Sequence, residues 1–503
     1  MFLENLHPKI VWNIFENVIT KTPRPSKHED RIRNKIRSWL REKEKLLDIK
    51  FQISQDDVGN LFISKPALKG YENNPSLLFQ AHMDMVCVSN RPEGYDFHNK
   101  GIPVRIQQNG EWVDADGTTL GADDGIGLAL ALALLTDPEI KHGPLEVLFT
   151  VNEEDGFTGA TQLDIDKLNI KSKYLINLDS GPLEKITIGS VCGRRVYICK
   201  TLIREKENVI ENPYFIDLEV NGLLGGHSGG DIHLPRANAN KIIGRILSKV
   251  NEEIDIFLCE WNGGVRTNVI PISSRIKFAI RAEEKNVFES IITEEISILY
   301  EYYKQKKYDT EKLEPNMNIE WSKAKPSKYF SKEDSKNAIT ISHLLPYGVI
   351  RKSPFFKDFV ETSINPGVVK TENNKLTFIS YPRSIFRPEL QDIVRRLIRI
   401  ADLTGWDHHL RAILPEWKPA LKSTLLNYVK DQYKAILKIE PETQVVHGGL
   451  EAGEISLKMS LQIVALGPTV EGEHSPSERL KIADVEKIYK ILKRIVENSS
   501  QLD

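Results

Sequence analysis

The stretch LEVLFTVNEEDG, residues 145–156, decides how this chain folds. It begins with an apolar, β-branched run and ends on three successive acids followed by Gly156. A short apolar run that stops at a glycine is typical of a buried strand. The predicted strand therefore leaves the core directly at two carboxylates, Glu153 and Glu154, whose charge needs a partner.

Similar apolar runs lie on both sides of this strand. They are SLLFQ at 76–80, KYLINL at 173–178 and LQIVAL at 461–466, and a helical pattern covers Gly125 to Leu135. Strands that alternate with helices predict an α/β unit with a mainly parallel sheet. The run at 461–466 and a closing helix with one apolar stripe over 482–495 are expected to complete that sheet.

The middle of the chain has a different pattern, with strand candidates separated by long helices such as Ala237–Asn251 and Val287–Lys304. It predicts a separate α+β unit. A chain of 503 residues is too long for one hydrophobic core. We expect one domain from residues 1–190 and 416–503, with residues 191–415 inserted into it. The Lys-rich stretch 304–335 is predicted to be a solvated loop.

Composition and charge exclude several classes of partner. There are 68 basic and 70 acidic residues, so no global charge attracts nucleic acid or an anionic membrane. The four cysteines include no CxxC pair, which favours a reducing compartment and a cytoplasmic location. The N-terminus lacks the pattern of a signal peptide. The longest apolar run, Ile126–Leu135, is about half the ~20 residues that span a bilayer.

Polar residues that can bind metals or move protons follow each apolar run. Ligands of open α/β sheets bind beyond the carboxyl ends of the strands, where these residues are expected to meet. Any one of these pairs alone is most often solvated surface, but the repetition favours a site. The residues are His82 and Asp84, Glu153 and Glu154, Asp179, Glu473 and His474, and, in a glycine-rich turn before a helix, Asp123 and Asp124.

Histidines and carboxylates without cysteine suit zinc or another divalent first-row metal. So many carboxylates in one cleft would repel each other unless more than one cation neutralised them. Two-metal sites of this kind belong to hydrolases. The loop GADDGIG at 121–127 is a poor phosphate-binding loop, because its spacing fits neither nucleotide motif and its acids would repel phosphate.

With these residues in place, the chain resembles the M20 family of zinc-dependent exopeptidases and deacylases. The motifs, in family order, are QAHMDMV, GTTLGADDGIG, VNEEDGFTGA, NLDS, GGHSGGDI, HGGLEAGE and EGEHSPSE. TTLGADDGIGLALALALL, HGGLEAGE and PRPSKHEDRI look most like the aminoacyl-histidine dipeptidase branch, whose members cleave Xaa-His dipeptides such as carnosine. The resemblance implies a zinc-exopeptidase-like mixed sheet between helices, with an inserted α+β lid domain.

The resemblance also implies a ligand set for two zinc ions per subunit, with Co²⁺ or Mn²⁺ as alternatives. His82 and Asp179 would hold one ion, and Glu154 and His474 the other. Asp123 would bridge the two. Members of this branch have an asparagine where this chain has Asp124, and we expect Asp124 to cap the following helix rather than to bind metal.

The remaining roles concern proton transfer and substrate binding. Glu153 would be the general base that activates a water between the metals, and Asp84 would orient His82. His227 would stabilise the oxyanion when the lid closes, from the same chain or from a partner in a homodimer. Asn268 and Arg383 are weaker candidates for binding the substrate carboxylate, and a surface position is an equal alternative for Arg383.

The leading functional prediction is therefore hydrolysis of small peptides, with Xaa-His dipeptides as substrates. A tripeptidase or an N-acyl amino acid deacylase of the same family stays open, as does a non-catalytic binding protein of this fold. Most other histidines are expected on the surface or in ordinary packing. His233 and His447 lie inside family-like motifs, but a role in the site is not the favoured interpretation for either.

Overall fold

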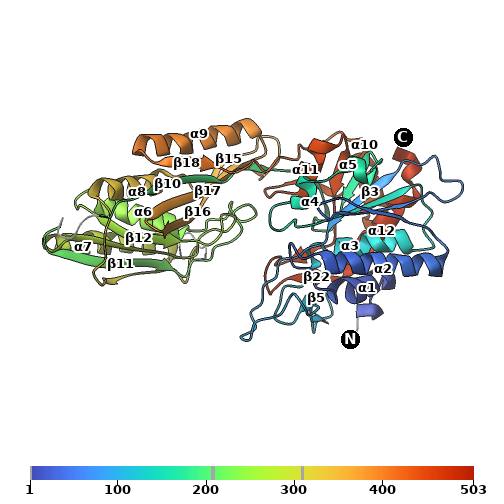
Figure 1. Cartoon of the computed structure of the whole chain (residues 1–503), viewed down its shortest axis with the longest axis horizontal. Coiled ribbons are helices and arrows are strands. Elements are labelled where there is room, and N and C mark those ends of the chain that lie inside the picture. Colours follow the sequence, from blue (N-terminus) through green and yellow to red (C-terminus); the bar gives the residue numbers. More distant parts are fainter. Residues whose placement is uncertain (1–2, 205–209, 307–310, 503) are drawn as a thin grey trace. The chain divides into compact units, whose positions relative to one another are not determined.

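The computed structural model describes residues 3–204, 210–306 and 311–502, which form two compact units (Figure 1). The first unit comprises Met1–Gly189, Trp417–Val445 and Leu450–Asp503, and the second comprises Ser190–Glu416 and Val446–Gly449. The second unit is thus inserted into the first, and the chain returns to it briefly at Val446–Gly449.

The first unit is built on an eight-stranded sheet in the order β1-β2-β6-β3-β7-β20-β8-β19. Its centre is parallel, because β3 pairs in parallel with β6 and β7, and β20 with β7. Antiparallel pairs lie further out, as in β1 with β2 and β2 with β6. The predicted α/β class with a mixed sheet is confirmed, and the expectation of a mainly parallel sheet holds only at the centre. The strands are β1 (Gln52–Gln55), β2 (Leu61–Lys65), β3 (Leu77–His82), β6 (Leu145–Thr150), β7 (Tyr174–Asn177), β8 (Lys185–Ser190), β19 (Glu442–Val446) and β20 (Gln462–Ala465).

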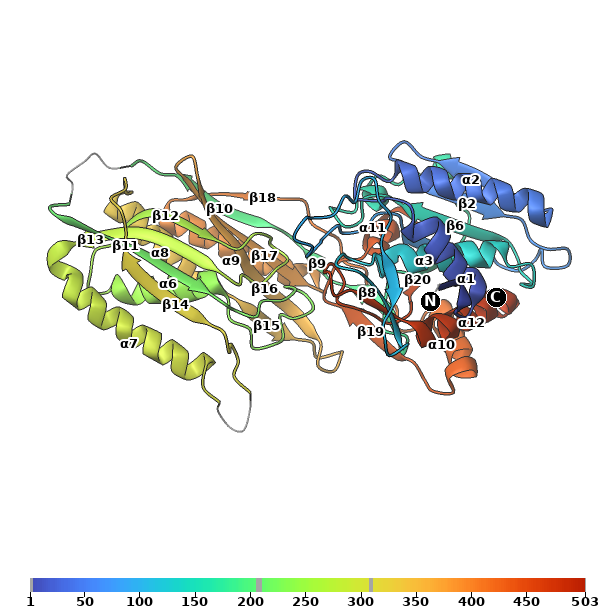
Figure 2. The ribbon, with the colours of Figure 1, turned by 90° about the horizontal axis from the view of Figure 1, so that it is seen from below.

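Helices cover this sheet on both sides (Figure 2). The apolar α3 is entirely buried beyond its first turn, and it packs against β3, α1 and α12. The other face is covered by α4, α5 and α11, whose apolar residues share a core with Phe62, Leu78 and Leu148. A small sheet of β4 (Val104–Ile106), β5 (Trp112–Ala115), β21 (Val470–Glu471) and β22 (Arg479–Lys481) lies apart from the main one. The helices are α1 (Lys9–Ile14), α2 (Asp30–Leu47), α3 (Ala122–Thr136), α4 (Thr158–Thr161), α5 (Ile165–Leu168), α10 (Thr424–Leu437), α11 (Glu451–Lys458) and α12 (Ile482–Glu497).

The second unit is an α+β layer built on a ten-stranded sheet with the main order β14-β11-β13-β12-β16-β17-β10-β18. Its core joins the inner faces of these strands to four helices. The strands are β9 (Cys192–Gly193), β10 (Val196–Thr201), β11 (Pro213–Asn221), β12 (Phe257–Gly263), β13 (Ser274–Arg281), β14 (Asn318–Lys323), β15 (Gly348–Lys352), β16 (Val360–Glu372), β17 (Lys375–Ser384) and β18 (Asp407–Leu410). The helices are α6 (Ala239–Val250), α7 (Lys285–Tyr303), α8 (Lys332–Leu344) and α9 (Arg387–Thr404).

The Lys-rich stretch 304–335 is more ordered than predicted. It contains β14, which pairs with β11, and the start of α8. Glu314 and Met317 within it are fully buried. The prediction of a solvated loop is therefore wrong for 311–335. The strand in this stretch lies at the edge of its sheet and has one polar face, so its sequence has too little apolar content to indicate a strand. Residues 307–310 lie outside the described chain.

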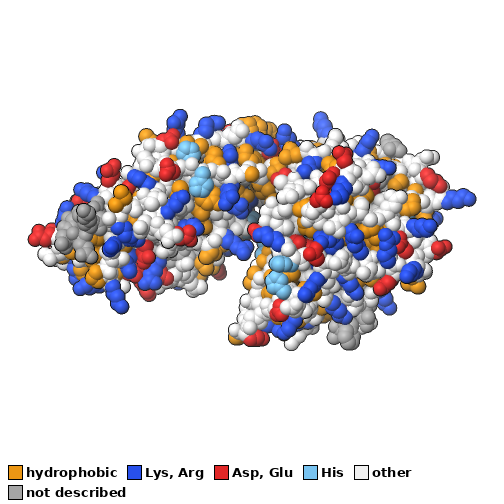
Figure 3. All heavy atoms as spheres, in the orientation of Figure 1, with side chains coloured by type: hydrophobic (Ala, Val, Ile, Leu, Met, Phe, Trp, Pro, Cys, Tyr) orange, Lys and Arg blue, Asp and Glu red, His pale blue; other side chains and the backbone are white. Residues whose placement is uncertain are grey.

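The surface agrees with the balanced composition. Basic and acidic side chains alternate over the visible face of each unit, without a large patch of one sign (Figure 3). Within the described residues, every helix is too short or too polar to cross a membrane.

Candidate metal centre

The carboxyl ends of the central parallel strands place four of the predicted site residues along one edge of the first unit's sheet. β3 ends at His82, β6 is followed by Glu153 and Glu154, and β7 is followed by Asp179. Parallel strands end at the same edge, which brings together residues that are up to about 100 positions apart in the chain.

Asp123 lies between two histidines. Its Oδ1 is 2.9 Å from His82 Nε2, and its Oδ2 is 3.1 Å from His474 Nε2. His474 Nε2 is also 2.9 Å from Glu154 Oε2. Ligand atoms of His82, Asp123 and Glu154 all lie within 4.8 Å of one another, as do those of His82, Asp124 and Asp179. All five predicted metal ligands thus meet in one cluster.

Asp124 takes the capping position that the sequence suggests. Its Oδ1 accepts a hydrogen bond of 3.1 Å from the backbone N–H of Gly127, and the helical backbone begins only after Asp124. Its Oδ2 accepts from the backbone N–H of His82 at 3.3 Å. The peptide bond between Asp123 and Asp124 is cis. The expected cap is confirmed, and the same carboxylate also holds the end of β3.

Asp84 links a predicted ligand to the predicted base. Its Oδ1 is 3.5 Å from His82 Nδ1 and accepts from the backbone N–H of Glu153 at 2.9 Å. Its Oδ2 accepts from the N–H of Glu154 at 3.2 Å and from Ser26 Oγ at 2.7 Å. Burial alone would raise the pKa of Asp84, but the hydrogen bond and charge of His82 and the other donors lower it. The carboxylate therefore stays ionised where it orients its neighbours.

The acids of the cluster crowd one another. Burial raises the pKa of Glu153 well above its ordinary value, and the charges of Glu154 and Asp179 add to the rise. Burial also raises the pKa of Asp179 well above its ordinary value, and the charge of Asp123 adds to it. Burial lowers the pKa of His474, but its hydrogen bonds to Asp123 and Glu154 outweigh this effect and raise the pKa to about 11. The cluster thus attracts positive charge.

These residues fit a divalent metal. Glu154 Oε1 is buried and has no hydrogen-bond partner among the described residues. A buried carboxylate oxygen without a partner is costly unless a cation binds it. The donors are imidazole nitrogens and carboxylate oxygens without a thiolate, a set that suits zinc and other first-row divalent ions.

Glu478 is a site residue that the sequence reasoning missed. It is 2% exposed, and its carboxylate accepts four backbone hydrogen bonds from the loop that bears Asp123. The donors are Leu120 and Gly121 at 2.8 Å, Ala122 at 2.7 Å and Asp123 at 3.2 Å. Its place in EGEHSPSE, four residues after His474, was the only available signal. Glu478 fixes the backbone from which Asp123 projects.

Arg24 holds the neighbouring backbone in the same manner. Its guanidinium is buried and donates to the carbonyls of Met83 at 3.1 Å, Asp84 at 2.7 Å and Gly121. Burial lowers its pKa, and the charges of Glu478 and Asp84 oppose that shift. Arg24 thereby connects the end of β3 to the loop of Asp123, a role that the sequence did not predict.

A buried polar network lies beneath the cluster. Glu451 Oε2, on α11, accepts from Thr150 Oγ1 at 2.5 Å and from Gln80 Nε2 at 2.7 Å. Gln80 Oε1 accepts from Asn177 Nδ2 at 2.6 Å, and Asn177 Oδ1 accepts from the N–H of Asp179 at 3.2 Å. Burial raises the pKa of Glu451 to about 7. The network joins three strands to a predicted ligand.

The second unit brings two other predicted residues together. His227 lies in the loop between β11 and α6, and Asn268 in the loop between β12 and β13. The loops pair, because Ser228 N–H donates to Asn268 O at 2.7 Å and Ile270 N–H to Gly226 O at 2.9 Å. Gly226 has φ 132°, and a Cβ there would lie 2.7 Å from Asp231 Oδ2, so the turn requires glycine.

The hydrogen bonds of His227 define its tautomer. Its Nδ1 accepts from the N–H of Gly230 at 3.0 Å, and its own backbone N–H donates to Asp231 Oδ2 at 2.7 Å. An Nδ1 that accepts carries no proton, so the neutral ring has its proton on Nε2. His227 therefore presents an Nε2–H donor without needing a positive charge.

Arg383 is buried, which excludes the surface position that the sequence left open as an equal alternative. It is 3% exposed, and its guanidinium lies 4.3 Å from the ring centroid of Tyr381. Burial lowers its pKa, and among the described residues it forms no ion pair.

Ser363, opposite Arg383 in the sheet register, forms a hydrogen bond of 2.7 Å with His447 Nε2. Burial and the charge of Arg383 lower the pKa of His447 to about 3, so His447 is neutral.

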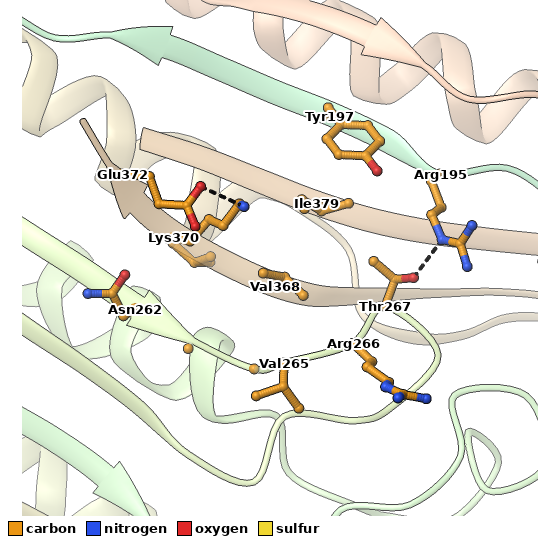
Figure 4. A pocket seen from close by; sticks show the side chains of 13 residues that line it. Arg195, Tyr197, Asn262, Val265, Arg266, Thr267, Val368, Lys370, Glu372 and Ile379 are labelled. Atoms are coloured by element: carbon orange, nitrogen blue, oxygen red, sulfur yellow. Dashed lines mark hydrogen bonds and ion pairs between the residues drawn. The ribbon is translucent and has the colours of Figure 1, made fainter. Parts of the chain in front are cut away.

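The second unit also has a cavity of about 410 Å³ beside the loop of Asn268 (Figure 4). Its wall includes Arg195, which donates from Nε to Thr267 Oγ1 at 2.9 Å. Lys370 and Glu372 form an ion pair at its other end. None of the predicted site residues lines it.

A mixed α/β sheet whose parallel strand ends bring His82 and buried carboxylates together with His474 and Asp123 defines a metal-dependent hydrolase. The chain belongs to peptidase family M20/M25/M40, whose sequence model matches residues 78–498.

Two relatives of 34% identity agree with this assignment, and a third structure shares the fold. The cytosol non-specific dipeptidase of Escherichia coli (strain K12) is 34% identical over 496 residues, which are 98% of each chain. The structure of an aminoacylhistidine dipeptidase from Vibrio alginolyticus is 34% identical, with a TM-score of 0.78 over 99% of this chain and 98% of that one. Human carnosine dipeptidase 1 shares the fold at 12% identity, with a TM-score of 0.50 over 98% of both chains.

Proposed function

We propose that the protein is a metal-dependent dipeptidase that cleaves Xaa-His dipeptides. The observation that supports this best is the position of Asp123 between His82 and His474, with Glu153 held beside them by Asp84. A second candidate is a dipeptidase of broad specificity, which the name of the Escherichia coli relative favours.

The proposed cofactor is a pair of zinc ions, with Co²⁺ or Mn²⁺ as alternatives. His82 and Asp179 would hold one ion, His474 and Glu154 the other, and Asp123 would bridge them. Bound there, the ions would supply the positive charge that polarises the scissile carbonyl and makes a water more acidic. The uncompensated Glu154 Oε1 and the crowded carboxylates support this assignment.

Glu153 is the proposed general base. Its raised pKa suits a carboxylate that takes a proton from the attacking water and passes it to the leaving amine. Asp84 orients His82 and, through the backbone N–H of Glu153, sets the start of the segment that carries the base. The base and its support thus come from two adjacent strand ends.

His227, Asn268 and Arg383 are proposed to bind the substrate. The Nε2–H of His227 would donate to the oxyanion of the tetrahedral intermediate. Arg383 has a buried guanidinium without an ion pair among the described residues, so a substrate carboxylate would supply its missing counter-charge. Asn268 would donate to the same carboxylate from the loop that pairs with that of His227.

The test is a substrate panel on protein of measured metal content. We expect hydrolysis of β-alanyl-histidine and other Xaa-His dipeptides, with slower cleavage of dipeptides that lack a C-terminal histidine. Equal rates on all dipeptides would favour the broad dipeptidase. Cleavage of a tripeptide alone, or of N-acyl amino acids alone, would replace the proposal by the corresponding family activity. Protein that binds metal but cleaves none of these would favour a non-catalytic binding role.

We further propose a cytoplasmic location, in keeping with the name of the Escherichia coli relative, and assembly as a homodimer. Mixing inactive Glu153→Ala and His227→Ala chains tests whether His227 acts across a dimer. Recovered activity in the mixture would mean that the histidine serves the partner's site, and its absence would assign His227 to its own chain.

A further inference from the structure

The loop that carries His227 runs from Gly222 to Ala237, and one carboxylate holds it at both ends. Glu314 Oε2 accepts from the backbone N–H of Leu224 at 2.7 Å, and Glu314 Oε1 accepts from that of Ala237 at 2.8 Å. His227 lies between these two anchored positions. The two oxygens of one side chain therefore set the distance between the ends of this loop.

Glu314 is itself held firmly. Its backbone N–H donates to Tyr303 O, at the end of α7, at 3.0 Å, and its carbonyl accepts from Met317 N–H at 3.2 Å. Met317 is fully buried, and the strand that follows pairs with β11. The carboxylate is thus attached to a helix end and to the sheet rather than to a free loop.

Among the described residues, both hydrogen bonds that the Glu314 carboxylate accepts come from this loop. Glu314 is 0% exposed and, among the described residues, forms no ion pair with a lysine or arginine. Hydrogen bonds from N–H groups to a buried carboxylate are among the stronger ones in proteins, since the acceptor is charged. A buried carboxylate whose partners among residues 3–204, 210–306 and 311–502 are two backbone N–H groups is costly for stability, which points to a further reason for its presence.

The bonds inside the loop transmit this anchoring to the imidazole. Asp231 accepts from the N–H of His227, and Gly230 donates to its Nδ1, so the ring is fixed to the loop backbone. The loop in turn pairs with that of Asn268 through Ser228. A change in the distance between the loop ends would therefore move the Nε2–H of His227 with the backbone.

We propose that Glu314 is a positioning residue for His227, which places the Nε2–H donor for catalysis by fixing both ends of its loop. This proposal rests on the proposed role of His227 in oxyanion stabilisation. It assigns a function to the Lys-rich stretch, whose sequence has no recognisable motif at Glu314.

The experiment compares Glu314→Gln and Glu314→Asp with His227→Ala in zinc-loaded full-length protein, on β-alanyl-histidine. Glutamine has a single acceptor oxygen, and aspartate keeps the charge but is too short to reach both loop ends. We expect kcat to fall about tenfold or more in both variants, as misplaced catalytic groups do, with little change in KM or zinc content. His227→Ala should lose about 10²- to 10³-fold in kcat, like other single oxyanion donors.

The decisive readout is the double variant. If Glu314 acts through His227, Glu314→Gln should cause no further loss of kcat in a His227→Ala background. The matched control is Glu295→Gln, which removes another buried carboxylate of the second unit, paired with Arg245 at 3.1 Å. It should lower thermal stability while leaving kcat unchanged.

Three results would overturn the proposal. Wild-type kcat in both Glu314 variants, with His227→Ala impaired, would show that the bonds from Glu314 to the loop ends do not affect catalysis. A full additional loss in the double variant would show that Glu314 acts by another route. Wild-type kcat in His227→Ala would overturn the oxyanion role itself, and the positioning role with it. Because aspartate retains the charge, Glu314→Asp keeps the test valid if Glu314→Gln fails to fold.

Discussion

Replacing Glu478 by glutamine should uncouple the Asp123 loop from the rest of the metal centre. The carboxylate accepts four backbone N–H groups, two on each oxygen. Glutamine keeps one oxygen and turns an NH₂ group toward the other two donors. Two buried N–H groups then lack an acceptor, at about 1–3 kcal/mol each. The variant should therefore lose about 2–6 kcal/mol of stability.

The effect on metal binding is the specific part of this prediction. Groups that support ligands from behind typically contribute 10- to 100-fold to metal affinity, and we expect a loss of about that size. Competition with a fluorescent zinc chelator measures the affinity, and urea unfolding of the metal-free protein measures stability. The matched control is Glu146→Gln, at the opposite end of β6, whose buried carboxylate accepts from Lys171 and Ser172.

The two variants separate a positioning role from a purely structural one. Both should be destabilised, but only Glu478→Gln should bind zinc more weakly. If Glu478→Gln bound zinc as tightly as the wild type while losing as much stability as Glu146→Gln, the argument that this carboxylate positions Asp123 would be refuted.

Three further predictions concern the base, the buried network and the substrate. Glu153→Ala should retain its metal but lose about 10²- to 10⁴-fold in kcat, whereas His82→Ala should lose metal; a metal-free Glu153→Ala would contradict the assignment. The pKa of Glu451 is raised from 4.5 to about 7, so its contribution to the stability of the metal-free protein is present below pH 4.5 and is lost as the pH rises through 7. Urea unfolding at several pH values should show this loss, and Glu451→Gln should flatten the dependence of stability on pH between 4.5 and 7. An unchanged pH dependence in the variant would exclude Glu451 as its source. Arg383→Lys should raise KM more than it lowers kcat, because lysine cannot bind a carboxylate with two parallel hydrogen bonds, and an unchanged KM would argue against carboxylate binding.

The sequence predicts the part of the site that lies at strand ends. His82, Glu153, Glu154 and Asp179 each follow an apolar run, and parallel pairing brings such ends together without further information. The helix expected from Gly125 begins there, after the cap of Asp124. These features depend on local patterns and on one topological rule, so they are visible in a single chain.

The supporting residues depend on contacts that a local pattern does not contain. Glu478, Glu314 and Arg24 bind backbone groups far away in the sequence, and each lies in a polar context that is typical of a surface. The sequence around Arg383 was equally compatible with a surface position, and only the structure shows it buried against Tyr381. A charged side chain in the interior is recognised by its partners, and those partners are fixed only by the tertiary fold.

The polar network across the central strands also bears on how the chain folds. β3, β6 and β7 are apolar over most of their length, and parallel strands of this kind have few features that distinguish one register from a neighbouring one. Gln80 lies opposite Asn177 in the native register and bonds to it. A shift of two residues would place Gln80 opposite Leu175 and leave its buried amide without that partner, at a cost of about 1–3 kcal/mol. A leucine at position 80 would make the sheet more apolar and, at the same time, remove the feature that selects its correct strand alignment.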